Sequence, residues 1–277
     1  MGSEQRDGRT PPRGRSRRPV ALTTLVVVLA LAAGLVLWLR AGGTGDDAAP
    51  SAAERPATTT PATVPTSTAP APTPTPTPTP TFDRDQLSIT DPASPWVVVN
   101  KARPLSPIDF APADLVPIGG GYQLRAEAAQ AMAAMIAAAA AEGLDVQVQS
   151  AYRAYDYQVG LFQAQVSRFG EERAEVQVAR PGYSEHQTGL AADVGGGGCD
   201  IESCFATTAE GQWVAAHGPQ FGFLVRYPEG RQDVTGFKYE PWHVRYVGVT
   251  LATEMQRTGV ATMEEFFGLP AAPGYLG

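Results

Sequence analysis

Residues 184–193 read Ser-Glu-His-Gln-Thr-Gly-Leu-Ala-Ala-Asp, and residues 240–243 read Glu-Pro-Trp-His. Together they offer two imidazoles, one carboxylate and a further glutamate three residues before the second imidazole. A catalytic zinc takes three such ligands and keeps a fourth position for water, whose pKa falls to about 7. The chain has only three histidines, so two of them in this setting indicate a metal site. The predicted ligands are His186, Asp193 and His243.

The spacing within the first stretch limits how it can fold. His186 and Asp193 are seven residues apart, so on one straight strand their side chains would face opposite sides of a sheet. They converge if His186 lies on a turn and Asp193 on the strand that follows. Gly189 permits the bend that this arrangement needs.

The second stretch places an acid beside a ligand. Pro241 makes a helix interior unfavourable, so we expect Glu240 at the start of a strand and His243 within it. We predict that Glu240 is the base that takes a proton from water and returns it to the leaving amine. Purely structural histidines and a surface carboxylate at Glu240 are the alternatives. His217, at the end of a predicted helix, is interpreted as structural.

The first 40 residues have the pattern of a membrane anchor. Six arginines in residues 1–19 precede an apolar run at residues 20–39. Twenty residues at about 1.5 Å each span roughly 30 Å, the thickness of a bilayer core. The arginines favour a cytoplasmic tail, so the remaining chain is predicted to lie outside the membrane. A cleaved signal peptide is the alternative, although its apolar region normally has about 7–15 residues.

Residues 40–81 are rich in alanine, threonine and proline, and end in a Pro-Thr alternation. This composition buries too little apolar surface to offset its ordering entropy, so a disordered linker is predicted. The alternating prolines favour extended polyproline II structure, which is typical of a semi-rigid spacer. The segment is interpreted as a tether, with an arbitrary linker as the alternative, and glycosylation of its threonines is left open.

Residues 82–277 are long enough for one domain with its own core. They carry 13 of the 21 basic and 23 of the 28 acidic residues. Nucleic-acid binding normally requires a basic surface, so this acidic domain is not expected to bind nucleic acid. Its two cysteines, Cys199 and Cys204, are predicted to form a disulfide outside the cytoplasm. Zinc ligation by the pair is the alternative, but no second pair at matching spacing completes a structural site.

The pattern of apolar residues indicates a mixture of helices and strands. Helices are predicted at residues 122–142, 155–169, 209–217 and 248–258. Strands or extended segments are predicted at residues 97–100, 145–149, 190–194, 223–227 and 242–247. Because helices and strands do not alternate regularly, we predict an α+β fold with a small, mostly antiparallel sheet flanked by helices. One transmembrane helix and the linker precede it.

Three ordered motifs resemble the VanY-like D-alanyl-D-alanine carboxypeptidases, which are zinc peptidases of bacterial cell-wall metabolism. The family pattern Ser-x-His-x-x-Gly-x-Ala-x-Asp fits residues 184–193, and Glu-x-Trp-His fits residues 240–243. The family's upstream Ser-x-Tyr-Arg motif fits residues 150–153, with Gln158 five positions after the arginine. The resemblance covers roughly residues 97–268 and nothing before them.

The resemblance implies roles for individual residues. It implies zinc ligands at His186, Asp193 and His243 and a catalytic Glu240. It implies substrate contacts from Arg153, Gln158 and Ser184. A guanidinium suits this role because it can grip a carboxylate through two parallel hydrogen bonds. Whether Arg153 holds the substrate's terminal carboxylate or the developing oxyanion is left open, and a surface ion pair is the alternative. Tyr152 and Trp242 are interpreted as either cavity wall or core.

The expected protein is therefore a single-pass bacterial membrane protein with an extracytoplasmic zinc D,D-carboxypeptidase domain. Its expected substrate is the peptidoglycan stem peptide ending in D-Ala-D-Ala, from which hydroxide supplied by the metal site would release the terminal D-alanine. A D,D-dipeptidase or a peptidoglycan endopeptidase with the same site is the nearest alternative. A non-catalytic wall-binding module is the alternative from another class, and the metal used in the cell is left open.

Overall fold

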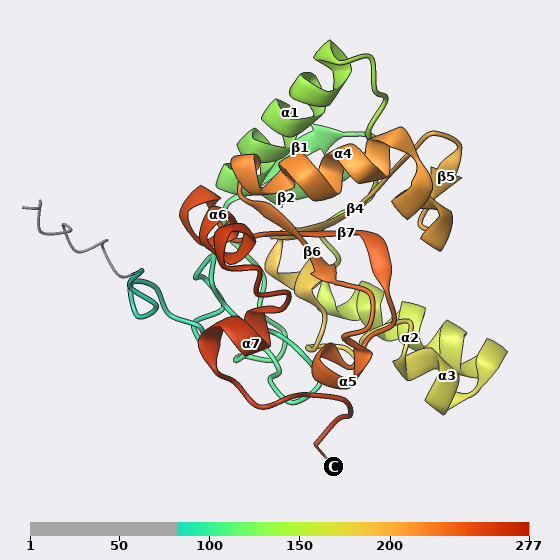
Figure 1. Ribbon diagram of the computed structural model, residues 1–277. Helices are drawn as coiled ribbons and strands as arrows, with labels where there is room; N and C mark the ends of the chain where they lie inside the picture. Colours follow the sequence, from blue (N-terminus) through green and yellow to red (C-terminus); the bar gives the residue numbers. More distant parts are fainter. Residues whose placement is uncertain (1–81, 277) are drawn as a thin grey trace, which may run out of the picture. The chain divides into compact units, whose positions relative to one another are not determined.

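A five-stranded sheet lies at the centre of the computed structural model, which describes residues 82–276 (Figure 1). Its path runs through β3 (Gln147–Ser150), β4 (Ala191–Gly196), β7 (Glu240–Tyr246) and β6 (Phe223–Tyr227), and β5 (Cys199–Asp200) pairs with β4. Every pairing in this sheet is antiparallel. A separate antiparallel hairpin joins β1 (Leu115–Gly119) to β2 (Tyr122–Arg125).

Seven α-helices and three short 3-10 helices complete the described part of the chain. The α-helices are α1 (Ala126–Ala141), α2 (Tyr155–Phe169), α3 (Glu171–Glu175), α4 (Ala209–His217), α5 (Gln232–Thr235), α6 (Val249–Thr258) and α7 (Met263–Phe267). The 3-10 helices are η1 (Glu185–Thr188), η2 (Ser203–Thr207) and η3 (Gly218–Phe221). Figure 1 shows α1 and α4 on one side of the sheet. The predicted α+β fold with a flanked, mostly antiparallel sheet is thus confirmed for the described residues.

The two faces of the central strands differ in chemistry because successive side chains of a strand point to opposite faces. Ala192, Val194 and Val244 belong to the apolar core, together with buried side chains of α1 and α4. Asp193 and His243 alternate with them in sequence and therefore belong to the other face. That face holds the polar groups of the candidate site. One face of the sheet consequently packs against the hydrophobic core, and the other face carries a cluster of charged side chains.

A second cluster of buried apolar side chains forms away from that core. It combines the segment before β1 with α6 and α7, and its buried members are Trp96, Val98, Val247, Leu251, Ala252, Met255, Met263 and Phe266. The indole Nε1 of Trp96 donates a hydrogen bond of 3.0 Å to the carbonyl of Val247. The two ends of the described domain are therefore packed together.

Several predicted elements differ from the structure at their boundaries. The helix expected at residues 122–142 begins only at Ala126, because residues 122–125 pair with β1 as a strand. Residues 97–99 are buried without forming a strand, and Asn100 makes only an isolated bridge to Arg103. The helices at residues 155–169 and 209–217 and the strand at residues 223–227 are confirmed at their predicted bounds.

The predicted cytoplasmic tail, membrane segment and linker, residues 1–19, 20–39 and 40–81, lie outside the described residues. Within residues 82–276, no helix combines the length and the apolar content needed to cross a membrane.

Cys199 and Cys204 form a disulfide, and no free cysteine is found in the described residues. Chain-entropy arguments give a loop of this size a stabilisation of about 2 kcal/mol. For a domain of this length we expect reduction to lower the melting temperature by roughly 4–8 °C. Calorimetry with and without dithiothreitol measures the shift. The double variant Cys199→Ser, Cys204→Ser is the control. Its melting temperature should already be low and should not respond to the reductant.

Candidate metal centre

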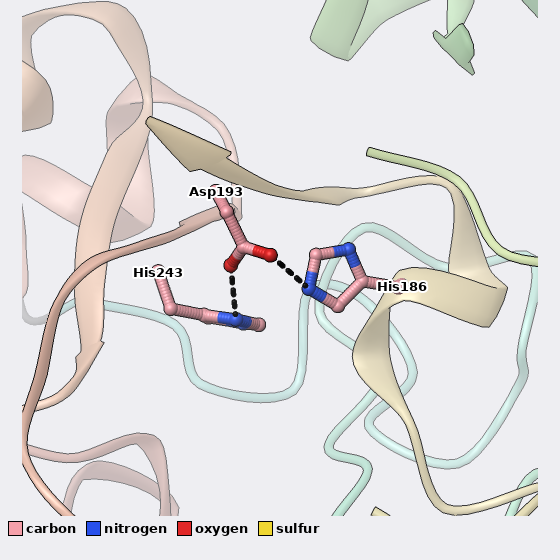
Figure 2. Close-up of side chains that lie close together, drawn as sticks. All are labelled: His186, Asp193 and His243. Carbon is pink, nitrogen blue, oxygen red and sulfur yellow. Dashed lines mark ion pairs between the residues drawn. The ribbon is translucent and has the colours of Figure 1, made fainter. Parts of the chain in front are cut away.

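Three side chains from separate elements converge at the centre of the sheet. His186 comes from η1, Asp193 from β4 and His243 from β7, where Asp193 and His243 are direct cross-strand partners. One ligand atom from each lies within 4.8 Å of the others, and all three residues are buried. Figure 2 shows the Asp193 carboxylate between the two rings, with one oxygen toward each. Oδ2 lies 3.4 Å from His186 Nε2, and Oδ1 lies 3.2 Å from His243 Nδ1.

The local structure around these residues agrees with the turn and strands expected from their spacing. His186 sits on the short helix that leads into β4, and Gly189 ends this helix with a left-handed φ of 69°. A Cβ at this glycine would lie 2.9 Å from a Leu115 side-chain carbon, so both conformation and space favour glycine. Glu240 is the first residue of β7, and His243 lies within that strand.

Each imidazole is oriented by a hydrogen bond on the side away from Asp193. Nδ1 of His186 lies 2.7 Å from the Ala151 carbonyl, and Nε2 of His243 lies 3.3 Å from Glu185 Oε2. Carbonyl and carboxylate oxygens only accept hydrogen bonds, so these ring nitrogens must donate. In the neutral rings the lone pairs then lie on the other two nitrogens, which face the Asp193 carboxylate. Two fixed imidazoles and a buried carboxylate are a donor set that zinc prefers, so the residues fit such an ion.

The pKa values of the two imidazoles are shifted in opposite directions. Burial and the nearby Arg153 guanidinium lower the pKa of His186 to about 4, so its ring is neutral at pH 7. Burial also opposes charge on His243, but hydrogen bonds to Asp193 and Glu185 outweigh it and raise its pKa to about 9. A metal ion at these ligands would therefore have to displace a proton from His243.

Glu185 belongs to a buried network of charges that the sequence analysis did not identify. Its Oε1 accepts hydrogen bonds from Arg226 Nε at 2.8 Å and Arg245 Nη1 at 2.9 Å. Arg226 also binds Glu264 through both of its terminal nitrogens, at 2.9 and 2.7 Å. The four side chains are 0% exposed and balance two positive against two negative charges. Glu264 Oε1 further accepts a hydrogen bond of 2.8 Å from Asn100. This set of five residues is called the arginine network below.

Because of the arginine network, we expect the folded domain to lose stability in acid. Burial alone would raise the pKa values of Glu185 and Glu264, but the neighbouring guanidinium groups outweigh it and hold both below their usual range. The stabilisation is therefore complete above the unfolded glutamate pKa of about 4.3 and is lost as the pH falls further toward the folded values. We expect the free energy of unfolding to fall steeply below about pH 4. Urea titrations between pH 7 and pH 3 measure it. Glu264→Gln should flatten this part of the profile.

Glu240 lies beside the three ligands without joining them. Its Oε2 is 3.9 Å from His243 Nδ1. Burial raises the pKa of Glu240 to about 7, which suits a group that must both accept and donate a proton near neutral pH. A divalent cation at the ligands would lower this pKa because it favours the carboxylate. Glu240 is therefore a neighbour of the candidate ligands and not one of them.

A cavity of about 850 Å³ opens over these residues. Arg153 and Ser184, two of the predicted substrate contacts, line it, and Tyr152 and Trp242 form part of its wall. Ser184 is buried, and its hydroxyl makes no hydrogen bond to the described residues.

Gln158 is placed differently from the expectation of a direct substrate contact. It does not line the cavity. Its Oε1 accepts a hydrogen bond of 3.1 Å from Arg153 Nε, and its Nε2 donates one of 2.8 Å to the Ala179 carbonyl. Arg153 Nη1 donates to Ser150 Oγ at 3.2 Å and forms an ion pair of 3.7 Å with Asp193 Oδ2, while its Nη2 has no hydrogen-bond partner among residues 82–276. Gln158 therefore fixes the Arg153 guanidinium, which keeps donors for a ligand.

Comparison with known proteins gives one consistent result. The sequence profile of the VanY family, described as D-alanyl-D-alanine carboxypeptidase, matches residues 121–249. YodJ of Bacillus subtilis, a carboxypeptidase by name, is 40% identical over 192 residues, which cover 65% of this chain and 69% of YodJ.

Two solved structures are similar as well. LdcB, an LD-carboxypeptidase, is 40% identical with a TM-score of 0.60, over 64% of this chain and 87% of LdcB. A variant of the vancomycin-resistance D,D-pentapeptidase VanY in complex with Zn(II) is 29% identical with a TM-score of 0.55, over 61% of this chain and 97% of that structure. The similarity therefore extends over nearly the whole length of a zinc-containing relative.

Proposed function

The chain belongs to the VanY family of D-alanyl-D-alanine carboxypeptidases and is a peptidase of that family, and we propose that it releases the terminal D-alanine from peptidoglycan stem peptides that end in D-Ala-D-Ala. One observation carries the proposal. The two imidazoles are already turned toward Asp193, in a cavity that also presents Glu240 and the Arg153 guanidinium. A metal site, a base and a carboxylate anchor are thus available to one bound peptide.

Each side chain of the cavity has a separate role in the proposed reaction. Arg153 binds the terminal carboxylate of the peptide through its free donors, and Ser184 donates a hydrogen bond to the peptide backbone. Glu240 takes the proton of the attacking water and delivers it to the departing amine. Zinc at the three ligands would activate the water and polarise the carbonyl. Pairing of β4 with β7 fixes Asp193 and His243 opposite each other, which supports a preformed arrangement of these two proposed ligands.

The proposal is tested by mass spectrometry of muropeptides treated with the zinc-loaded full chain. We expect pentapeptides to lose one D-alanine and to become tetrapeptides. Release of D-Ala-D-Ala, hydrolysis of cross-linked muropeptides, or binding to peptidoglycan without turnover would each contradict the proposed reaction. Those products would instead support a dipeptidase, an endopeptidase or a wall-binding module.

An L,D-carboxypeptidase is the second candidate, because the similarity to LdcB is higher than that to VanY in both identity and TM-score. Such an enzyme would convert tetrapeptides into tripeptides. The same muropeptide digest distinguishes the two activities, because the expected D,D-activity leaves tetrapeptides intact.

We also propose that the domain lies outside the cytoplasm of a bacterial cell, held by a membrane anchor at residues 20–39. The arginines before this apolar run support the orientation. Carbonate extraction of membranes should leave the chain in the pellet, and protease added to spheroplasts should remove the domain. Recovery in the soluble fraction would support a cleaved signal peptide instead.

Arg153→Lys is expected to raise KM for the pentapeptide by about 10- to 100-fold, because the ammonium group cannot form two parallel hydrogen bonds with a carboxylate. Steady-state kinetics measure this change. A peptide with a C-terminal amide is the control, since it should be poor for the wild type and no worse for the variant. A fall in kcat with unchanged KM would instead assign Arg153 to the oxyanion.

A further inference from the structure

A loop that contains the disulfide contributes Ile201 and Glu202 to the lining of the cavity. It comprises residues 197–204 and is called the disulfide loop here. Its β5 strand pairs with the end of β4, with Gly195 opposite Asp200 and Gly196 opposite Cys199. The bond to Cys204 then holds the far end of the loop, at η2. Because both ends are held, the residues at its tip have a defined position.

Ile201, at the tip, has an unfavourable backbone conformation. Its φ is +50°, and every other residue with positive φ among residues 82–276 is glycine. A β-branched residue in this region is strained by about 1–3 kcal/mol. Ile201 is nevertheless 41% exposed and lines the cavity, so packing alone does not account for its backbone conformation. An apolar surface is therefore presented to a ligand at a position that glycine or asparagine would occupy more easily.

Glu202 follows Ile201 and also lines the cavity. It is exposed, and its carboxylate makes no hydrogen bond or ion pair with residues 82–276. The other carboxylates of the cavity are different, because Asp193, Glu185 and Glu240 are buried and lie close to histidine or arginine side chains. The tip of the loop thus combines an apolar surface with an uncompensated negative charge.

The sheet register places this tip opposite Arg153. On β4, Gly195 pairs with Gln147 of β3 and with Asp200 of β5, so β3 and β5 must lie on opposite edges of that strand. Arg153 follows β3, and Ile201 follows β5. They therefore reach the cavity from opposite sides of β4, which carries Asp193. A peptide that had its terminal carboxylate at Arg153 and crossed β4 at Asp193 would therefore reach Ile201 and Glu202.

We propose that Ile201 and Glu202 form a subsite for the side chain of a residue on the N-terminal side of the scissile bond, and that this side chain is an aliphatic chain ending in an ammonium group. The aliphatic part packs on Ile201, and the ammonium group pairs with the Glu202 carboxylate. The inference rests on the proposed function, since it uses Arg153 as the anchor of the terminal carboxylate. It makes the disulfide loop a determinant of which stem peptides are accepted.

The test uses synthetic pentapeptides with lysine, Nε-acetyl-lysine or alanine before D-Ala-D-Ala, and the zinc-loaded full chain. We expect acetylation to lower kcat/KM about two- to fivefold at low salt, and less at high salt, as for an exposed ion pair. Glu202→Gln should remove the preference for lysine over acetyl-lysine. Asp200→Asn is the matched control, because Asp200 is exposed on the same loop but does not line the cavity. It should keep the preference.

Ile201→Asn separates a binding role from a structural one. Asparagine tolerates a left-handed φ, so the melting temperature should stay unchanged or rise. KM for the lysine and acetyl-lysine peptides should rise about three- to tenfold through loss of the apolar contact, with kcat within about twofold. An unchanged KM would overturn the subsite. So would a lysine preference that survives Glu202→Gln or disappears equally in Asp200→Asn.

Calorimetric affinities of the three peptides for the Glu240→Gln full chain give the same comparison without turnover. Equal affinity for lysine and acetyl-lysine peptides in this background would also overturn the subsite. A wild-type chain that releases no D-alanine would contradict the proposed function, whereas the affinities would still decide the subsite.

Discussion

Glu240→Gln is expected to lower kcat for D-alanine release by about 10²- to 10⁴-fold while one zinc ion per chain remains bound. Glutamine keeps the shape of the side chain but cannot accept the proton of the attacking water. The raised pKa of Glu240, about 7, comes mainly from burial, so the loss follows from removing a base that this environment maintains. Stopped assays of D-alanine release and metal analysis of the same sample measure both quantities.

The arrangement of the ligands makes this prediction specific. Glu240 is 3.9 Å from His243 Nδ1, while Asp193 lies 3.2 Å from the same atom. Asp193→Asn is therefore the matched control, and it should lose metal as well as activity. If Glu240→Gln lost zinc to a similar extent, Glu240 would be a ligand, and the base would have to be sought elsewhere.

Glu185→Gln is expected to weaken zinc binding by about 10- to 100-fold, because the His243 ring loses the carboxylate that orients it. The same change leaves an uncompensated positive charge between Arg226 and Arg245, so the free energy of unfolding should fall by about 3–5 kcal/mol. Competition with a chromophoric chelator measures the affinity, and urea unfolding measures the stability.

Glu264→Gln is the matched control, because Glu264 contacts Arg226 but not His243. We expect it to lose stability to a similar extent and to keep its affinity for zinc. An equal loss of affinity in both variants would mean that the network acts only through general stability.

Where Glu185→Gln fails to fold, nitrogen-15 spectra of the wild-type chain still test the role of Glu185. With three histidines in the sequence, the His243 signals can be assigned by elimination. They should report a proton on Nε2 in the zinc-loaded chain. A proton on Nδ1 instead would contradict orientation by Glu185.

The cluster of His186, Asp193 and His243 could be predicted because the constraints on its backbone lie within two short stretches. The seven-residue spacing of His186 and Asp193, the bend at Gly189 and the proline after Glu240 each restrict the backbone locally. The structure places these residues on a turn, at the start of a strand and within strands, as those constraints require. Residues 184–193 and 240–243 were expected to meet because a metal site needs ligands from both. The cross-strand pair of Asp193 and His243 brings them together.

The arginine network could not be predicted because its members are far apart in sequence. Arg226 and Glu185 are 41 residues apart, and Asn100 and Glu264 are 164 apart. Single arginines and glutamates normally lie at the surface, so nothing local marks these as buried. The hairpin of β1 and β2 was missed for a related reason, since its Tyr122–Arg125 strand runs directly into an alanine-rich helix with strong intrinsic propensity. Tertiary pairing overrode that propensity for four residues.

The links between the two ends of the domain define where the chain can be cut. The family profile matches residues 121–249, yet Arg226 takes one carboxylate partner from Glu264 and Arg245 donates to the carbonyls of Pro95 and Val97. A chain limited to residues 121–249 would contain Arg226 and Arg245 but would lack these hydrogen-bond acceptors. The smallest segment that keeps these contacts therefore includes the residues around Trp96 and the helix α7. A recombination breakpoint inside either of them would separate the candidate metal site from the residues that support it.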